Sequence, residues 1–314
     1  MMSKRRMARA AAAVAVVGGG VGLGLPAAGL VILDDTPLAE YQAPTPRAAQ
    51  ATGGFTINGN FESSGVLVAP NVVLGASHAA ASATPAGRRF VIDGQSYQVA
   101  SVVRLDGDTD ATDGRDTAIF TLTAPVTGVT PATVYRGDAD ALVGQTAFYS
   151  GLGDRGTGSM PPPTAGGGPD GLLLVGENVI ESAGGTFTDG DETVTLPDSI
   201  LFADFDDGTA AANSLGGADP RRLEMGLAIG DSGGGVFVLN PLTGGYELAA
   251  LHSLVIGEDF GYGSVSGSTT FTPQDLAAIN AVIPEPGTAG LLLMGLGGLM
   301  LRRAERGGSA RSGG

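Results

Sequence analysis

Short apolar segments separated by tight-turn residues recur through most of the chain. Two of the turns are Asn58-Gly59 and Asp93-Gly94, dipeptides that favour a two-residue β-hairpin because both positions tolerate a positive φ. Such spacing, without intervening helical periodicity, predicts an all-β barrel or sandwich. We expect strands within residues 55–61, 65–78, 88–105, 116–126, 144–153, 171–182, 199–205, 234–240 and 246–255.

One helix is expected, over residues 272–283. Thr272 can cap its first turn, Pro273 suits its first position, and apolar residues recur at helical spacing behind them. The predicted architecture is therefore all-β with a C-terminal helix.

Composition and charge exclude several classes of function. The 314 residues include no cysteine, which rules out disulfides, thiolate metal sites and a cysteine nucleophile. Eight of the 17 basic residues and two of the 32 acidic residues lie in the two terminal segments. The body between them carries 9 basic and 30 acidic residues, a net charge of −21. Such a surface repels phosphates, so no nucleic-acid partner is expected.

The N-terminus resembles an export signal. Lys4, Arg5, Arg6 and Arg9 precede an apolar run that ends in small residues, which predicts a signal peptide over residues 1–28. An uncleaved membrane anchor is the alternative. Residues 29–54 are rich in Pro and Ala and predict a leader or propeptide of low structure. Their alternative is an extra edge strand at LVILDD.

The C-terminal segment, residues 284–314, has a distinct three-part pattern. Pro284-Glu285-Pro286 precedes 15 uncharged residues, Gly287 to Leu301, and then Arg302 and Arg303. The apolar run is shorter than the ~20 residues of a spanning helix. An ordinary core helix is the alternative. The segment resembles the PEP-CTERM sorting signal, which implies cleavage by the membrane transpeptidase exosortase in a Gram-negative bacterium. It also implies transient membrane contact and display at the outer surface or in extracellular matrix.

Three further motifs stand in a fixed order in the body of the chain. His78 ends the segment SGVLVAPNVVLGASH, Asp116 begins DTAIFTL, and Ser232 lies in GDSGGG. Together they resemble the trypsin-like (chymotrypsin-fold) serine proteases, over residues 55–283. The resemblance implies a two-barrel fold and a secreted endopeptidase that acts on proteins or peptides without a cofactor.

The resemblance also assigns roles to individual residues. His78 would take the proton of the Ser232 hydroxyl, because a serine is a poor nucleophile without a base. Asp116 would hold the imidazole in one tautomer. The backbone amides of Gly230 and Ser232 would form the oxyanion hole.

Three more residues are assigned to the substrate pocket. Gly226 aligns with the position that carries Asp in enzymes selective for Lys or Arg, which implies an apolar or small preference instead. His252 and Ser253 match a strand that lines the substrate groove in the family, where the serine packs near the catalytic Asp. His252 either borders the pocket or is a strand histidine bonded to a backbone carbonyl.

The loop LDGDTDATDGRD contains several carboxylates before Asp116. Asp106, Asp108 and Asp110 alternate in a way that resembles a calcium loop, but the distal bidentate Glu is missing. A solvated acidic loop is the alternative, and no other metal site is expected. The sequence also departs from the family because it lacks a recognisable activation site, which leaves Asp231 without an identified partner.

Two other functions are alternatives to the endopeptidase. A non-catalytic, protease-like surface or matrix binding protein would retain the fold, but such proteins usually lose a catalytic residue, and here all three are present. An α/β-hydrolase esterase would place Ser232 before a helix. The residues after Ser232 instead read as a strand.

Overall fold

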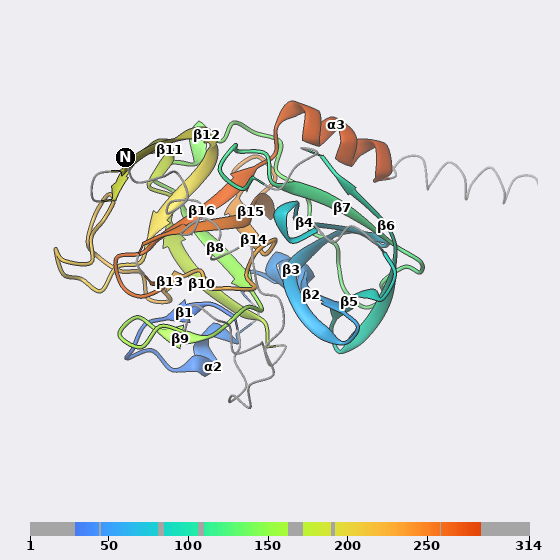
Figure 1. The fold of residues 1–314 in the computed structure, drawn as a ribbon, viewed down its shortest axis with the longest axis horizontal. Coiled ribbons are helices and arrows are strands. Elements are labelled where there is room, and N and C mark those ends of the chain that lie inside the picture. Colours follow the sequence, from blue (N-terminus) through green and yellow to red (C-terminus); the bar gives the residue numbers. More distant parts are fainter. Residues whose placement is uncertain are drawn as a thin grey trace, which may run out of the picture.

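The computed structural model describes residues 29–43, 45–80, 85–105, 110–162, 172–189, 192–257 and 259–283. Within these residues the fold is almost entirely β, in two halves that lie side by side (Figure 1). The predicted signal peptide and sorting segment fall outside the described residues.

The first half is a closed barrel with the strand order β2-β3-β4-β7-β6-β5. Every neighbouring pair in it is antiparallel. Closure leaves no free sheet edge, so the barrel needs no covering element. Its strands are β2 (Thr52–Ile57), β3 (Asn60–Ala69), β4 (Val72–Ala76), β5 (Arg88–Ile92), β6 (Gln95–Arg104) and β7 (Thr117–Leu122).

Two of the barrel's hairpins turn where the sequence predicts. Asn58 and Gly59 have φ values of 53° and 86°, and Asp93 and Gly94 have 49° and 69°. Both central residues of each turn are left-handed, as a type I′ turn requires. The predicted hairpins of β2 with β3 and of β5 with β6 are confirmed.

The second half is a seven-stranded, barrel-like antiparallel sheet with the order β10-β8-β14-β15-β16-β12-β11. β12 is long: it forms a hairpin with β11, interrupted by a bulge, and its last part pairs on the other side with β16. The strands are β8 (Thr146–Gly151), β10 (Leu174–Val179), β11 (Ser182–Asp189), β12 (Glu192–Asp204), β14 (Gly235–Leu239), β15 (Tyr246–Ile256) and β16 (Val265–Thr270).

The segment before the first barrel is ordered, so the low structure expected for residues 29–54 is wrong. β1 (Val31–Ile32) is the middle strand of a small sheet with β13 (Met225–Gly226) and β9 (Gly156–Thr157). Val31 and Ile32 are buried. The apolar residues of LVILDD therefore pack into the second half and form a strand, as the alternative predicts, but it is a middle strand and not an edge strand. The boundary expected at residue 55 falls inside β2.

Helical structure is sparse in the described chain. α3 (Pro273–Val282) confirms the predicted C-terminal helix, and its cap is a reciprocal pair in which Thr272 and Asp275 bond each other's backbone amides. α3 lies along the first barrel, near β7 (Figure 1), and its Ile279 belongs to that core. The other elements are α2 (Leu38–Tyr41), η1 (Arg47–Ala51), η2 (His78–Ala80) and η3 (Asp140–Leu142).

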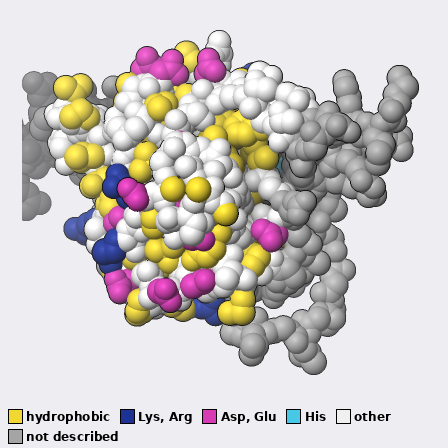
Figure 2. Space-filling view, turned by 90° about the vertical axis from the view of Figure 1, so that its left-hand side faces the viewer, with side chains coloured by type: hydrophobic (Ala, Val, Ile, Leu, Met, Phe, Trp, Pro, Cys, Tyr) yellow, Lys and Arg dark blue, Asp and Glu magenta, His cyan; other side chains and the backbone are white. Residues whose placement is uncertain are grey.

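Acidic side chains outnumber basic ones in the body of the chain. Figure 2 shows acidic side chains spread over one face, with most of the fewer basic side chains towards its left side. No described helix has the length and apolar character needed to span a membrane.

Candidate active site

The loop between β13 and β14 presents Ser232, and the first barrel fixes its position. The Ser232 carbonyl accepts a hydrogen bond from the amide of Ser64 on β3, at 3.0 Å. The Ser64 hydroxyl donates to the carbonyl of Gly230 at 3.0 Å. Gly233 has a φ of +81°, and a Cβ there would lie 2.5 Å from the Ser64 carbonyl oxygen. Only glycine fits this approach.

His78 lies two residues beyond the end of β4, at the start of η2, and faces Ser232. Its Nε2 is 2.9 Å from the Ser232 Oγ. Its Nδ1 is 2.6 Å from Oδ2 of Asp116. A carboxylate can only accept, so Nδ1 carries the proton and Nε2 presents its lone pair to the serine hydroxyl. This is the tautomer that a general base requires.

Asp116 precedes β7 and is held by three donors. Its Oδ1 accepts the backbone N–H of His78 at 2.8 Å, and its Oδ2 accepts the Ser253 hydroxyl at 2.5 Å as well as the imidazole. β4 and β7 are paired in the barrel, with Ala76 opposite Thr117. This register brings His78 and Asp116 together, and β15 supplies Ser253 from the other half.

The amides around Ser232 divide into two groups. Those of Asp231, Gly233 and Gly234 donate to the carbonyls of Ala228, His252 and Asp231 respectively. Among the described residues, the amides of Gly230 and Ser232 donate to no acceptor. Two such donors beside the hydroxyl are suited to a developing oxyanion. These are the two amides that the sequence predicts for this role.

Asp231, whose partner the sequence leaves unidentified, binds backbone amides from three separate segments. Its Oδ1 accepts from Gly153 at 2.9 Å, and its Oδ2 accepts from Ala228 at 2.9 Å and from Leu30 at 3.3 Å. Burial raises the pKa of Asp231 to about 7, although the amide bonds lower it. The segment before β1 is therefore anchored directly behind the Ser232 loop.

His252 lies in the interior, away from any exposed pocket. Its ring stacks on Tyr149 at 5.7 Å between centroids, and its Nδ1 is 3.1 Å from the Ser268 hydroxyl. Burial lowers the pKa of His252 to about 3, so the ring is neutral. The side chain has no exposed surface. This placement disfavours the prediction that His252 borders the substrate pocket and favours the alternative of a buried strand histidine.

Gly226 lies on β13 beside the aromatic ring of Phe205. A Cβ there would be 3.1 Å from the ring of Phe205. Two residues earlier, the Glu224 carboxylate is buried and accepts the amide of Arg221 at 2.6 Å. Burial raises the pKa of Glu224 to about 9.

The acidic loop of the sequence is described only in part. Asp106 and Asp108 lie outside the described residues. Asp110 accepts hydrogen bonds from the amide and hydroxyl of Thr112 at 2.9 and 2.6 Å. These bonds form a local turn, and the calcium prediction stays untested.

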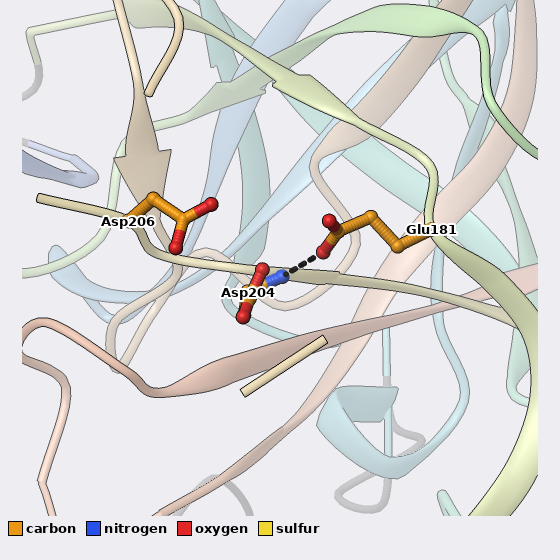
Figure 3. Close-up of side chains that lie close together, drawn as sticks. All are labelled: Glu181, Asp204 and Asp206. Atoms are coloured by element: carbon orange, nitrogen blue, oxygen red, sulfur yellow. Dashed lines mark hydrogen bonds between the residues drawn. The ribbon is translucent and has the colours of Figure 1, made fainter. Parts of the chain in front are cut away.

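A second acidic group was not found from the sequence. Glu181, Asp204 and Asp206 bring their carboxylates together in the second half, and their ligand atoms lie within 4.8 Å of one another (Figure 3). The run ADFDDG is visible in the sequence, but Glu181 is more than twenty residues away. No local motif predicts that they meet.

Comparisons with known proteins find a similar fold among solved structures. No family model matches the sequence. A search of curated proteins likewise finds no match. Among solved structures, the chain resembles neuropsin, a serine protease expressed in the limbic system of mouse brain. The TM-score is 0.51 at 17% identity, over 72% of this chain and 91% of neuropsin. With its barrel and barrel-like sheet, the chain therefore has the chymotrypsin-like fold.

Proposed function

We propose that the protein is a serine endopeptidase that hydrolyses peptide bonds through an acyl-enzyme. The observation that supports this best is the continuous path from the Ser232 hydroxyl through the imidazole of His78 to the carboxylate of Asp116, with contacts of 2.9 and 2.6 Å. The three residues come from a loop of the second half and two strand ends of the first. Precise contacts between such distant segments are what an activated nucleophile requires.

The geometry supports the following steps. Ser232 Oγ attacks the carbonyl carbon of the substrate while His78 Nε2 takes the hydroxyl proton. The carbonyl oxygen becomes an oxyanion and accepts hydrogen bonds from the amides of Gly230 and Ser232. The C–N bond then breaks, and His78 returns the proton to the leaving amine. Water, deprotonated by the same imidazole, hydrolyses the acyl-enzyme and restores the serine.

The proposed substrate is a protein or peptide with an apolar or small residue before the scissile bond. Gly226 offers no carboxylate where a Lys- or Arg-selective enzyme would have one, and the Phe205 ring lies against it. Profiling with a peptide library tests this. Cleavage after Ala, Val or Leu is expected, and preferential cleavage after Lys or Arg would contradict it.

We also propose that the protein is exported and processed at both ends. The basic and apolar N-terminus and the Pro284-Glu285-Pro286 segment support a signal peptidase and an exosortase-type enzyme as its processing partners. Its location would be the outer surface or extracellular matrix of a Gram-negative bacterium. Mass spectrometry of the protein recovered outside the cell tests both cuts, and an intact full-length chain there would reject them.

Covalent labelling with a fluorophosphonate tests the catalytic proposal. Such reagents modify an activated serine, so the wild type should label while Ser232→Ala does not. His78→Ala should reduce the labelling rate by about 10³-fold or more, because the hydroxyl loses its base. Ser101→Ala, which removes an exposed hydroxyl on β6, is the matched control and should label like the wild type.

The same experiment separates the endopeptidase from the non-catalytic alternative. A folded and processed wild-type protein that does not label, and that cleaves no peptide in the library, would be a protease-like binding protein. Circular dichroism on each variant distinguishes loss of reactivity from loss of fold.

A further inference from the structure

Three carboxylates converge at one end of the second half. Asp204 is the last residue of β12, Asp206 follows it, and Glu181 lies in the short connection between β10 and β11. Figure 3 shows the three side chains pointing towards a common space. Oxygen atoms bound to one Ca²⁺ lie no more than about 5 Å apart, given bond lengths of 2.3–2.6 Å. The separation within 4.8 Å matches that span.

Backbone amides satisfy only part of this group. Glu181 accepts from the amides of Asp204 at 3.2 Å and Gly217 at 3.3 Å. Oδ2 of Asp204 accepts from the amides of Ser214 and Leu215, each at 2.5 Å. These bonds involve the loop between β12 and β13, so the carboxylates also hold that loop.

Two buried oxygens of this group have no hydrogen-bond donor among the described residues. Asp204 and Asp206 are only 1% and 4% exposed, yet Oδ1 of each has no hydrogen-bond partner. The ion pairs seen among the described residues do not include any of the three carboxylates. A buried carboxylate oxygen without a donor or a cation is costly. The arrangement is therefore incomplete as it stands.

We propose that Glu181, Asp204 and Asp206 bind a divalent cation, Ca²⁺ by preference. The three side chains offer only carboxylate oxygens, which are hard ligands suited to Ca²⁺ or Mg²⁺ and poorly suited to metals that prefer nitrogen or sulfur. Ca²⁺ accepts the irregular geometry of side chains from three segments, whereas Mg²⁺ demands a near-ideal octahedron. Water or backbone carbonyls would complete its coordination.

The cation would stabilise the β12–β13 loop. That loop begins at Phe205, which packs against Gly226, and its backbone at Ser214 and Leu215 is already bonded to Asp204. Neutralising the carboxylates would remove their mutual repulsion and keep these bonds. Binding itself does not depend on the proposed protease activity, so a failure of one leaves the other intact.

Calorimetric titration of the purified, EDTA-treated full chain with CaCl₂ tests the site. One equivalent should bind. Asp206→Asn should weaken binding by about tenfold or more, because a charged ligand is lost. Asp206 is chosen for this substitution because none of the described residues donates a hydrogen bond to its carboxylate, so the change to Asn breaks no such bond. Asp110→Asn tests the other candidate, the acidic loop, and should bind Ca²⁺ like the wild type.

Thermal unfolding of the same proteins gives a second readout, because the difference in melting temperature between Asp206→Asn and the wild type should change sign between EDTA and Ca²⁺. In EDTA, Asp206→Asn should melt above the wild type because one repelling carboxylate is gone. In saturating Ca²⁺ the wild type should gain about 5 °C or more and overtake the variant. Glu181→Gln should likewise lose the gain from Ca²⁺. In EDTA it should melt below the wild type, because its NH₂ group would face one of the two backbone amides that Glu181 accepts.

Several results would overturn the proposal. These are no Ca²⁺ binding by the wild type, unchanged binding by Asp206→Asn, or loss of binding by Asp110→Asn alone. The last would place the cation in the acidic loop. An Asp206→Asn protein that melts below the wild type in both EDTA and Ca²⁺ would show that the carboxylate serves the apo fold instead.

Discussion

At the scale of single residues, Asp116 shows how one carboxylate can set the state of another side chain. Both of its oxygens accept from His78, one from the backbone and one from the ring. The Ser253 hydroxyl adds a third donor. Because only donors face it, the carboxylate permits a single imidazole tautomer.

Asp116→Asn should therefore reverse that tautomer. The asparagine oxygen would keep the bond from the His78 backbone, so its NH₂ would face Nδ1 and donate to it. The ring proton would move to Nε2, which could no longer take the Ser232 proton. We expect kcat to fall by about 10⁴-fold while the fold remains. Steady-state kinetics on a peptide substrate measure this, and a fall of less than tenfold would contradict the assigned role.

The catalytic candidates could be found from sequence because each has its own local context. His78, Asp116 and Ser232 stand at strand ends in short, distinctive segments, so chain order and neighbours identify them. The carboxylates of Glu181, Asp204 and Asp206 have no such context. They meet only because β12 pairs with β11 and places Asp204 beside the turn that carries Glu181, and no short motif encodes that pairing.

At the scale of elements, the sequence predicts turns and caps better than it predicts polar strands. Asn58-Gly59, Asp93-Gly94 and the Thr272 cap are confirmed because local chemistry decides each of them. β16 is missing from the predicted strands. Its residues, VSGSTT, lack the apolar pattern of a strand, and its partners β12 and β15 supply the pairing that makes it one.

The Ser232 loop depends on a close approach between the two halves, and Gly233→Ala tests it. An alanine there would adopt a strained φ of +81° and place Cβ 2.5 Å from the Ser64 carbonyl oxygen and 2.8 Å from the Ala76 amide. Backbone atoms of a closed barrel cannot easily move away. We expect a loss of at least about 2 kcal/mol in the free energy of unfolding, and loss of fluorophosphonate labelling.

Gly59→Ala is the control for that substitution. Its φ of +86° is similar, but no atom lies within 4 Å of the added Cβ. It should cost only the strain of a left-handed alanine, about 1 kcal/mol. Urea unfolding of both variants separates strain from steric conflict, and equal losses would rule out the close approach as the cause.

At the scale of the whole molecule, the N-terminal segment bonds directly to the second half, next to residues that lie about 200 positions later in the sequence. The Leu30 amide bonds Asp231 behind the nucleophile, and the Tyr41 hydroxyl donates to the carbonyl of Glu224 at 2.8 Å. The Pro- and Ala-rich composition of this segment predicts little structure, because composition does not reveal contacts with distant parts of the chain. The second half supplies the apolar surface against which Val31 and Ile32 are buried.

The same half also holds buried acids that link folding to pH. Burial raises the pKa of Glu224 to about 9, from its ordinary value of 4.5. As pH rises above about 4.5, the unfolded chain releases this proton while the folded chain keeps it until about pH 9. The unfolded state then binds fewer protons, so stability falls with rising pH across that window.

Glu224→Gln should remove this dependence. A glutamine is isosteric with the protonated acid, its oxygen can accept the Arg221 amide, and it has no proton to lose. In EDTA, we expect the variant's advantage in the free energy of unfolding to grow by at least about 1 kcal/mol between about pH 5.5 and pH 8.5. Urea titrations at several pH values measure it. Asp219→Asn, which removes an exposed carboxylate from the β12–β13 loop, should leave the wild-type slope unchanged. An advantage of Glu224→Gln that stays constant with pH would mean that Glu224 is already ionised in the folded protein.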